Sequence, residues 1–96
     1  MQQAVFLDRD GVVNEAIVEF GKPRPPRNTG ELRILEGVRN SVEMLLEKGF
    51  QVVVVTNQPD IARGTTETKT VHSFHEFISA QTGIKHFYIC RSEEHT

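Results

Sequence analysis

The chain has 96 residues, of which 38% are hydrophobic and 25% are charged, and its formal net charge is −2. This balance is typical of one small globular domain; it excludes a disordered or membrane-embedded chain and gives no general attraction for nucleic acid or anionic lipid. A single cysteine cannot form an internal disulfide, and the residues after Met1 show no signal-peptide pattern. The cytoplasm is therefore the expected compartment.

The first predicted element is a strand at residues 4–7, a continuous apolar run that stops at an acidic turn, residues 8–11. An uninterrupted run of this length is typical of a strand buried on both faces of a sheet. Residues 12–29 show no sustained period, and their glycine and prolines exclude a regular helix while favouring extended or turn geometry. We expect this segment to be a proline-rich flap.

A helix is predicted at residues 37–48, ending at Gly49, with four apolar side chains on one face. These side chains are Val38, Val42, Leu45 and Leu46. The β-branched run at residues 51–56 predicts a second buried strand.

A second helix is predicted at residues 66–82, ending at Gly83, and a third strand at residues 86–90. The stripe expected to be buried on this helix is Val71, Phe74, Ile78 and Gln81. The alternation of strands and helices predicts an α/β fold with a doubly wound parallel sheet and right-handed crossovers.

Four polar side chains fall where two neighbouring strands of this sheet end: Asp8, Asp10, Thr56 and Asn57. Sheets of this class bind ligands beyond the carboxyl ends of their strands. Two carboxylates there call for a hard cation, and Mg²⁺ is held by carboxylates, waters and substrate phosphate oxygens. With its charge offset, Asp8 can attack phosphorus as a nucleophile, while Asp10 protonates the leaving oxygen and later activates water.

The turn sequence DRDGVVN, residues 8–14, resembles the first motif of the haloacid dehalogenase (HAD) superfamily, and TNQ, residues 56–58, resembles the second. The similarity is closest to the histidinol-phosphate and heptose-bisphosphate phosphatases, whose IARG segment matches residues 61–64. The resemblance implies a HAD-like Rossmannoid fold without a large cap domain. It also implies a cytoplasmic, Mg²⁺-dependent phosphatase that acts on a small phosphorylated metabolite, of the sugar bisphosphate or histidinol-phosphate type, through an aspartyl phosphate.

The resemblance assigns roles to single residues. It makes Asp8 the nucleophile and Asp10 the acid and base, and it makes both magnesium ligands, with Asp10 acting through its backbone carbonyl. The candidate phosphate-binding and substrate-binding residues are Thr56, Asn57, Arg63, Gly11 and Asn14.

Compared with the family pattern, residues 1–96 are expected to be a single truncated domain. The basic third motif and the acidic fourth motif find no match, so the C-terminal strands are expected to be missing and turnover to be impaired. The subfamily's zinc loop would begin near Cys90 and His95, but two ligands do not make a structural zinc site, so no zinc is expected. The strand at residues 4–7 would then be a sheet edge, where self-association is a hazard.

Other interpretations stay open. The rival to the enzyme is a non-enzymatic anion- or protein-binding module that retains the fold. The basic residues of the flap, Lys22, Arg24 and Arg27, fit a solvated loop, or a site for a second substrate phosphate. The minimal PxxP pattern at residues 23–26 would suit a polyproline-binding partner. His72 and His75 are expected on the helix surface, and no nucleic acid or membrane partner is expected.

Overall fold

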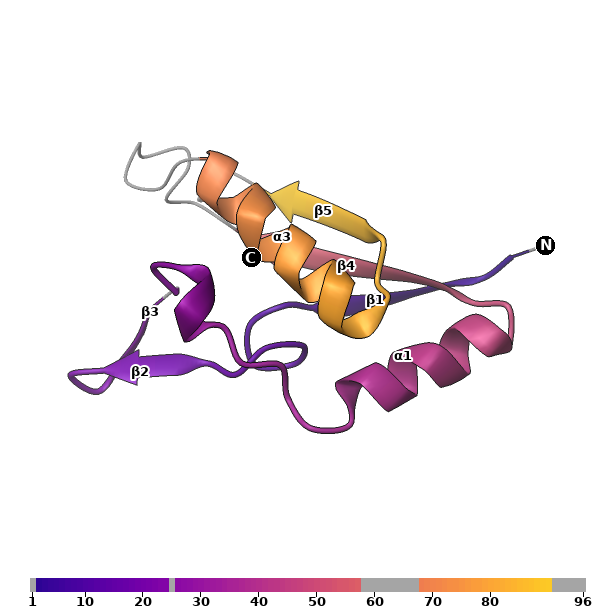
Figure 1. Cartoon of the computed structure of the whole chain (residues 1–96), viewed down its shortest axis with the longest axis horizontal. Helices are drawn as coiled ribbons and strands as arrows, with labels where there is room; N and C mark the ends of the chain where they lie inside the picture. The colour runs from indigo at the N-terminus through magenta and orange to yellow at the C-terminus, as the bar shows by residue number, and fades with distance from the viewer. Residues whose placement is uncertain (1, 25, 58–67, 91–96) are drawn as a thin grey trace.

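The computed structural model describes residues 2–24, 26–57 and 68–90, which form a layer of helix packed on a small parallel sheet, with a hairpin at one end (Figure 1). The elements in chain order are β1 (Ala4–Asp8), β2 (Ile17–Glu19), β3 (Lys22–Arg24), the 3₁₀ turn η1 (Thr29–Glu31), α1 (Val38–Glu47), β4 (Gln51–Asn57), α3 (Thr68–Thr82) and β5 (His86–Cys90). Neither helix of this described part has the length and apolarity that a membrane span requires.

The main sheet has three parallel strands in the order β1-β4-β5. Its register places Asp8 beside Val55, and Val55 beside Tyr88. The two crossovers step in the same direction along the sheet, so crossovers of one hand place both helices on the same face. The parallel α/β prediction is confirmed, and the described part contains the helices of one face of such a sheet.

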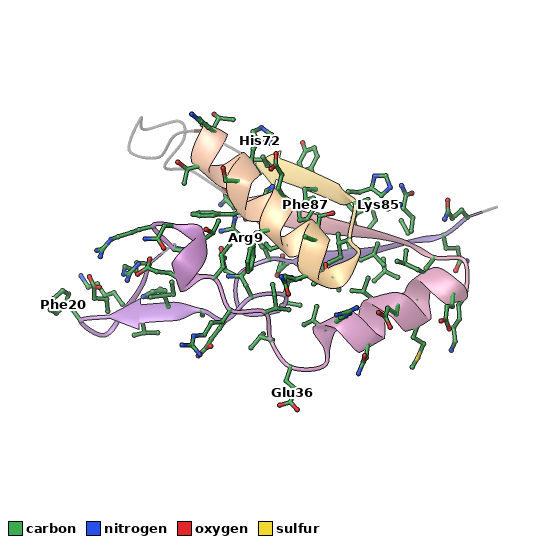
Figure 2. All side chains as sticks on the ribbon, viewed as in Figure 1. Arg9, Phe20, Glu36, His72, Lys85 and Phe87 are labelled. Carbon is green, nitrogen blue, oxygen red and sulfur yellow. The ribbon has the colours of Figure 1, made fainter. Side chains whose placement is uncertain are left out.

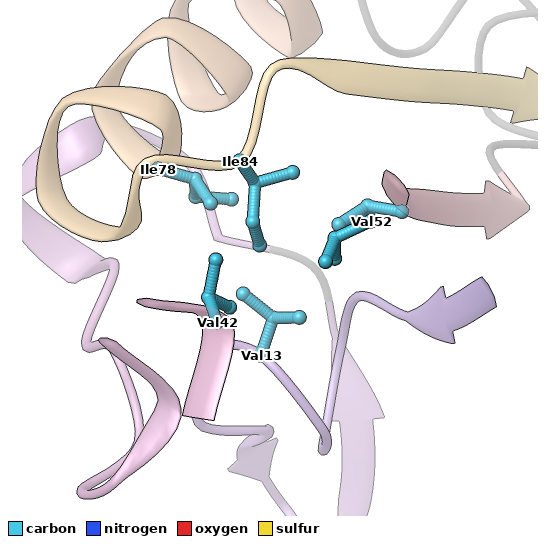
Figure 3. Packing of buried hydrophobic residues seen from close by; sticks show 6 residues of the cluster. Val13, Val42, Val52, Ile78 and Ile84 are labelled. Carbon is cyan, nitrogen blue, oxygen red and sulfur yellow. The ribbon is translucent and has the colours of Figure 1, made fainter. Parts of the chain in front are cut away.

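The hydrophobic core lies between that face and the two helices (Figure 3). Its fully buried members are Val13, Val42, Val52, Val54, Ile78 and Ile84. They converge because alternate residues of β4 point towards the helices, while α1 and α3 each present one apolar stripe. Burying each such side chain contributes about 1.5–3 kcal/mol, which makes this cluster the main source of stability.

The prediction that the first strand is buried on both faces is wrong. Exposure alternates along β1, and Phe6 keeps 67% of its surface exposed. On the same face of the sheet, Tyr88 of β5 is 62% exposed. The physical reason is the topology, because both described helices cover the opposite face. As the three-strand argument predicted, β1 is an edge of the described sheet.

The buried stripes of the helices also differ in part from the predicted ones. Leu46 is 44% exposed on α1, and Gln81 is exposed on α3. The stripe of α3 continues from Ile78 to Thr82, because residues four apart lie on the same face of a helix. The buried Thr82 hydroxyl is satisfied by donating to the Ile78 carbonyl at 2.8 Å. The expectation of a surface position for His75 is wrong as well, since only 5% of the residue is exposed.

Within residues 12–29, the predicted flap, the structure contains a short β-hairpin. β2 and β3 form an antiparallel hairpin whose two-residue loop, Phe20 and Gly21, has φ values of 54° and 73°. Two positive φ angles are typical of the tight turns that join twisted strands. Phe20 lies at the tip and is 94% exposed, whereas Val13 and Asn14, at the start of the predicted flap, are buried.

Candidate active site

The carboxyl ends of β1 and β4 bring together three of the predicted site residues. Asp8 ends β1 and pairs with Val55, so Thr56 and Asn57 lie at the same edge of the sheet on the neighbouring strand. The Asp8 and Asn57 side chains are exposed, and Thr56 is buried on the helix side of the sheet. The edge therefore presents an exposed carboxylate next to an exposed amide, while the Thr56 side chain is buried on the other face of the sheet.

A tight turn after β1 brings Asn14 back against Asp10. The amides of Val13 and Asn14 donate to the Arg9 carbonyl at 2.8 and 3.1 Å, and the Gly11 amide donates to the Asn14 carbonyl at 2.8 Å. Gly11 has φ 87°, a conformation that is costly for a residue with a Cβ. Gly11 thus serves the turn geometry that places the neighbouring side chains.

The Asp10 carboxylate is held from two sides. Asn14 Nδ2 donates to Oδ1 at 2.9 Å, and Arg9 Nη2 lies 3.1 Å from both carboxylate oxygens. The Asp10 side chain is still 41% exposed, so one side of the carboxylate faces outward. Asn14 is buried, and among the described residues its Oδ1 has no hydrogen-bond partner. In this arrangement Asn14 orients Asp10 and does not lie on the open surface as a ligand contact.

Arg9 is the residue of the site that sequence reasoning missed. It is 1% exposed, its Nη1 lies 3.3 Å from His75 Nε2, and its guanidinium lies 5.8 Å from the centroid of the Phe74 ring. A buried cation needs a partner, and Asp10 supplies it. The available signal was the position of an arginine between two acidic residues at the end of a predicted buried strand.

His75 lies beneath Arg9 in the same interior. Its ring stacks on Phe87 of β5, with centroids 4.4 Å apart and the planes 10° from parallel. Burial, and after it the Arg9 charge, lower the pKa of His75 to about 4. The ring is therefore neutral at physiological pH.

Two basic residues in and after the hairpin, Arg24 and Arg27, are paired with glutamates. Arg24 contacts Glu31 at 2.8 Å and Glu19 at 3.0 Å, and Arg27 contacts Glu19 at 3.2 Å. The hydrogen bond from Arg24 is the main reason that the pKa of Glu31 falls to about 2, with a second contribution from the Arg27 amide. These contacts brace the hairpin against η1, so the expected open basic cluster is largely compensated.

Two predicted residues, Arg63 and His95, lie outside the described residues. Cys90, the other zinc candidate, ends β5 as a half-buried free cysteine in register with Asn57. Within the described ranges, no group of three or more His, Cys, Asp or Glu side chains is placed to hold a metal ion.

The donor atoms at the edge fit magnesium. Asp8 offers an exposed carboxylate, and the nearby Asp10 carbonyl is a second hard oxygen donor. Mg²⁺ commonly takes one or two protein oxygens and completes its octahedron with waters and phosphate oxygens. The Asp10 carboxylate, in contrast, is already engaged by Arg9 and Asn14.

No protein family model matches the chain. The chain is 28% identical over 93 residues to the D-glycero-D-manno-heptose-1,7-bisphosphate 7-phosphatase of Chlorobaculum tepidum. The aligned region covers 92% of this chain and 44% of that protein. The chain is 40% identical over 63 residues to the D-glycero-beta-D-manno-heptose-1,7-bisphosphate 7-phosphatase of Haemophilus ducreyi, over 66% of this chain and 31% of that protein.

A solved structure is similar as well: the D,D-heptose 1,7-bisphosphate phosphatase from B. bronchiseptica, complexed with magnesium and phosphate. The TM-score is 0.79 with 28% identity, over 98% of this chain and 52% of the other. The chain thus spans less than half the length of the two relatives and about half of the solved structure. Over that span the chain is similar in sequence to heptose bisphosphate phosphatases, and it shares the α/β fold of the solved phosphatase structure.

Proposed function

We propose that the protein takes part in magnesium-dependent hydrolysis of a small phosphorylated metabolite, with a sugar bisphosphate as the first candidate, through a phosphoryl group carried by Asp8. The observation that carries the proposal is the edge of the sheet where the exposed Asp8 lies beside Thr56 and Asn57. The similarity of the protein to heptose bisphosphate phosphatases extends over nearly the whole chain, and the structure of one such phosphatase contains magnesium and phosphate.

The proposed reaction has two steps. An Asp8 oxygen forms a bond to phosphorus while the bond from phosphorus to the leaving oxygen breaks, and Asp10 gives that oxygen its proton. A water molecule then attacks the phosphorus of the aspartyl phosphate, Asp10 takes its proton, and the bond to Asp8 breaks to release inorganic phosphate. Bound Mg²⁺, held by the Asp8 carboxylate and the Asp10 carbonyl, would supply the positive charge that offsets repulsion between the carboxylate and phosphate.

The neighbouring residues support these steps in different ways. Thr56 and Asn57 are neutral groups that can orient phosphoryl oxygens without adding charge. Gly11 and Asn14 act through the turn, because they fix where Asp10 lies. Arg63 stays a substrate-binding candidate on its sequence match alone.

The choice of substrate rests on similarity, and histidinol phosphate stays the second choice. Arg24 in the hairpin and Arg27 after it are held by glutamates, so a second phosphate would compete with existing ion pairs for them. We therefore expect any preference for a bisphosphate to depend on breaking these pairs, or on the exposed Lys22.

A second candidate is an anion-binding module without turnover. It is favoured by the small donor set of the described part, which holds no metal-binding group of three or more such side chains. Binding of phosphate analogues without release of phosphate would support it over the enzyme.

Phosphate release from heptose bisphosphate, histidinol phosphate and fructose bisphosphate tests the proposal directly. Release should require Mg²⁺ and should vanish in an Asp8→Asn variant that folds normally. Glu36→Gln is the matched control, because Glu36 is an exposed carboxylate at the periphery, away from Arg9 (Figure 2). Release that persists in Asp8→Asn would contradict the assignment of the nucleophile.

A further inference from the structure

A buried side-chain network connects the proposed acid and base to helix α3. Arg9 Nη2 lies 3.1 Å from both Asp10 oxygens, and Arg9 Nη1 lies 3.3 Å from His75 Nε2. Arg9 and His75 are 1% and 5% exposed, whereas the Asp10 side chain is 41% exposed. The network is thus interior at the histidine and open at the carboxylate.

The chemistry of the two groups fixes the direction of the contact between them. A guanidinium is permanently protonated and can only donate, so His75 Nε2 must be the unprotonated acceptor. Nδ1 then carries the proton and the ring is neutral, in agreement with the lowered pKa of His75. A protonated His75 would have no acceptor to offer Arg9.

Packing holds the histidine ring in place. The ring stacks on Phe87, and the neighbouring Phe74 lies against the Arg9 guanidinium. In Figure 2, Arg9 and Phe87 lie beside α3, whereas Phe20 and Glu36 lie at the periphery. The side of the Arg9 guanidinium that faces away from Asp10 is therefore positioned by α3 and β5, two elements that follow the motif residues 8–14 in the chain.

We propose that His75 is a positioning residue for Asp10. By accepting from Nη1, it fixes the plane of the Arg9 guanidinium, and the other donors of that guanidinium then meet the carboxylate of Asp10. His75 itself touches no reacting atom. The inference rests on the proposed function, because it assigns a catalytic purpose to the orientation of Asp10.

Three variants, with a fourth in reserve, separate positioning from general destabilisation. His75→Leu removes the acceptor and keeps much of the volume, while His75→Gln keeps an acceptor oxygen at similar reach. Thr82→Val is the matched control on the same helix, because its buried hydroxyl bonds to Ile78 and Ile84 instead of Arg9. His75→Asn, whose amide is too short to reach Arg9, replaces the leucine variant should that one not fold.

The first measurement is water exchange of the Arg9 Nε proton by NMR, with the signal assigned through Arg9→Lys. Exchange should be slow in the wild type, in His75→Gln and in Thr82→Val, and at least about tenfold faster in His75→Leu, the lower limit expected for loss of one hydrogen bond to a charged group. Equal exchange in His75→Leu and the wild type would overturn the proposal.

The second measurement is the Mg²⁺-dependent affinity for beryllofluoride, a mimic of a phosphoryl group on aspartate. His75→Leu should bind about tenfold more weakly and His75→Gln should recover the affinity, as expected for one lost hydrogen bond. Equal weakening in Thr82→Val would overturn the positioning role. If the wild type binds no beryllofluoride, the proposed function fails, and the exchange comparison still decides whether His75 orders Arg9.

Discussion

The ion pair between the buried Arg9 and the partly exposed Asp10 predicts that its two partners have unequal effects on stability. Removing the carboxylate in Asp10→Ala leaves the Arg9 guanidinium, 1% exposed, without its counter-charge. Breaking a buried pair in this way costs about 3–5 kcal/mol, and we expect about 3 kcal/mol because water reaches the open side of Asp10. A chain of this length has a total stability of about 5–10 kcal/mol, so the loss is large.

Substitution of the other partner, in Arg9→Met, should lower the stability of the fold by less. Asp10 can be hydrated once Arg9 is gone, since 41% of its side chain is exposed. The remaining cost, about 1–2 kcal/mol, arises because the buried His75 Nε2 loses its hydrogen-bond donor. The predicted order is therefore Asp10→Ala more destabilising than Arg9→Met.

Urea unfolding followed by circular dichroism measures both values. The exposed helical pair Arg39 and Glu43 provides matched controls, and Arg39→Met or Glu43→Ala should each change stability by less than about 0.5 kcal/mol. An Arg9→Met variant that is less stable than Asp10→Ala would contradict this order, because it would show that Arg9 stabilises the fold by packing and not as a compensated charge.

Three further predictions concern other parts of the molecule. The pKa of His75 is about 4 in the folded state and 6.5 in the unfolded state, so the unfolded state binds more protons between these values. The free energy of unfolding therefore falls by about 3 kcal/mol as the pH drops from 6.5 to 4. His75→Gln should flatten the pH profile of urea midpoints, and an unchanged profile would contradict this prediction. Gly11→Ala should lower the free energy of unfolding by about 1–2 kcal/mol, because a φ of 87° is unfavourable for alanine, although no atom blocks the added Cβ. An unchanged stability in thermal unfolding would show that the turn relaxes. Self-association through β1, an edge strand with an exposed Phe6, should be weakened by Phe6→Lys in sedimentation velocity. Phe20→Lys at the exposed hairpin tip should leave self-association unchanged, and equal effects of the two substitutions would argue against association through β1.

The order of elements could be predicted because it depends on local patterns. The β-branched run at residues 51–56, the positive-φ cap at Gly49 and the strand at residues 86–90 all follow from short-range chemistry, and the structure contains each of them. The exposed face of β1 could not be read in the same way, since an apolar run does not reveal how many layers cover it.

The site was predictable only where its residues share a strand end. Asp8, Thr56 and Asn57 meet because parallel strands place their carboxyl ends together, which the pattern already implied. The contact between Arg9 and His75 depends on how α3 rotates over the sheet, and no local signal fixes that rotation. For this reason His75 was expected at the surface, although it lies in the interior.

The most direct test of the account is a titration of the intact chain with beryllofluoride and Mg²⁺, followed by fluorine NMR, on the wild type and on Asp8→Asn. We expect a bound fluorine signal that requires Mg²⁺ and is absent from the folded Asp8→Asn variant. A signal of equal strength in both proteins, or none in the folded wild type, would contradict a phosphoryl-accepting site at Asp8.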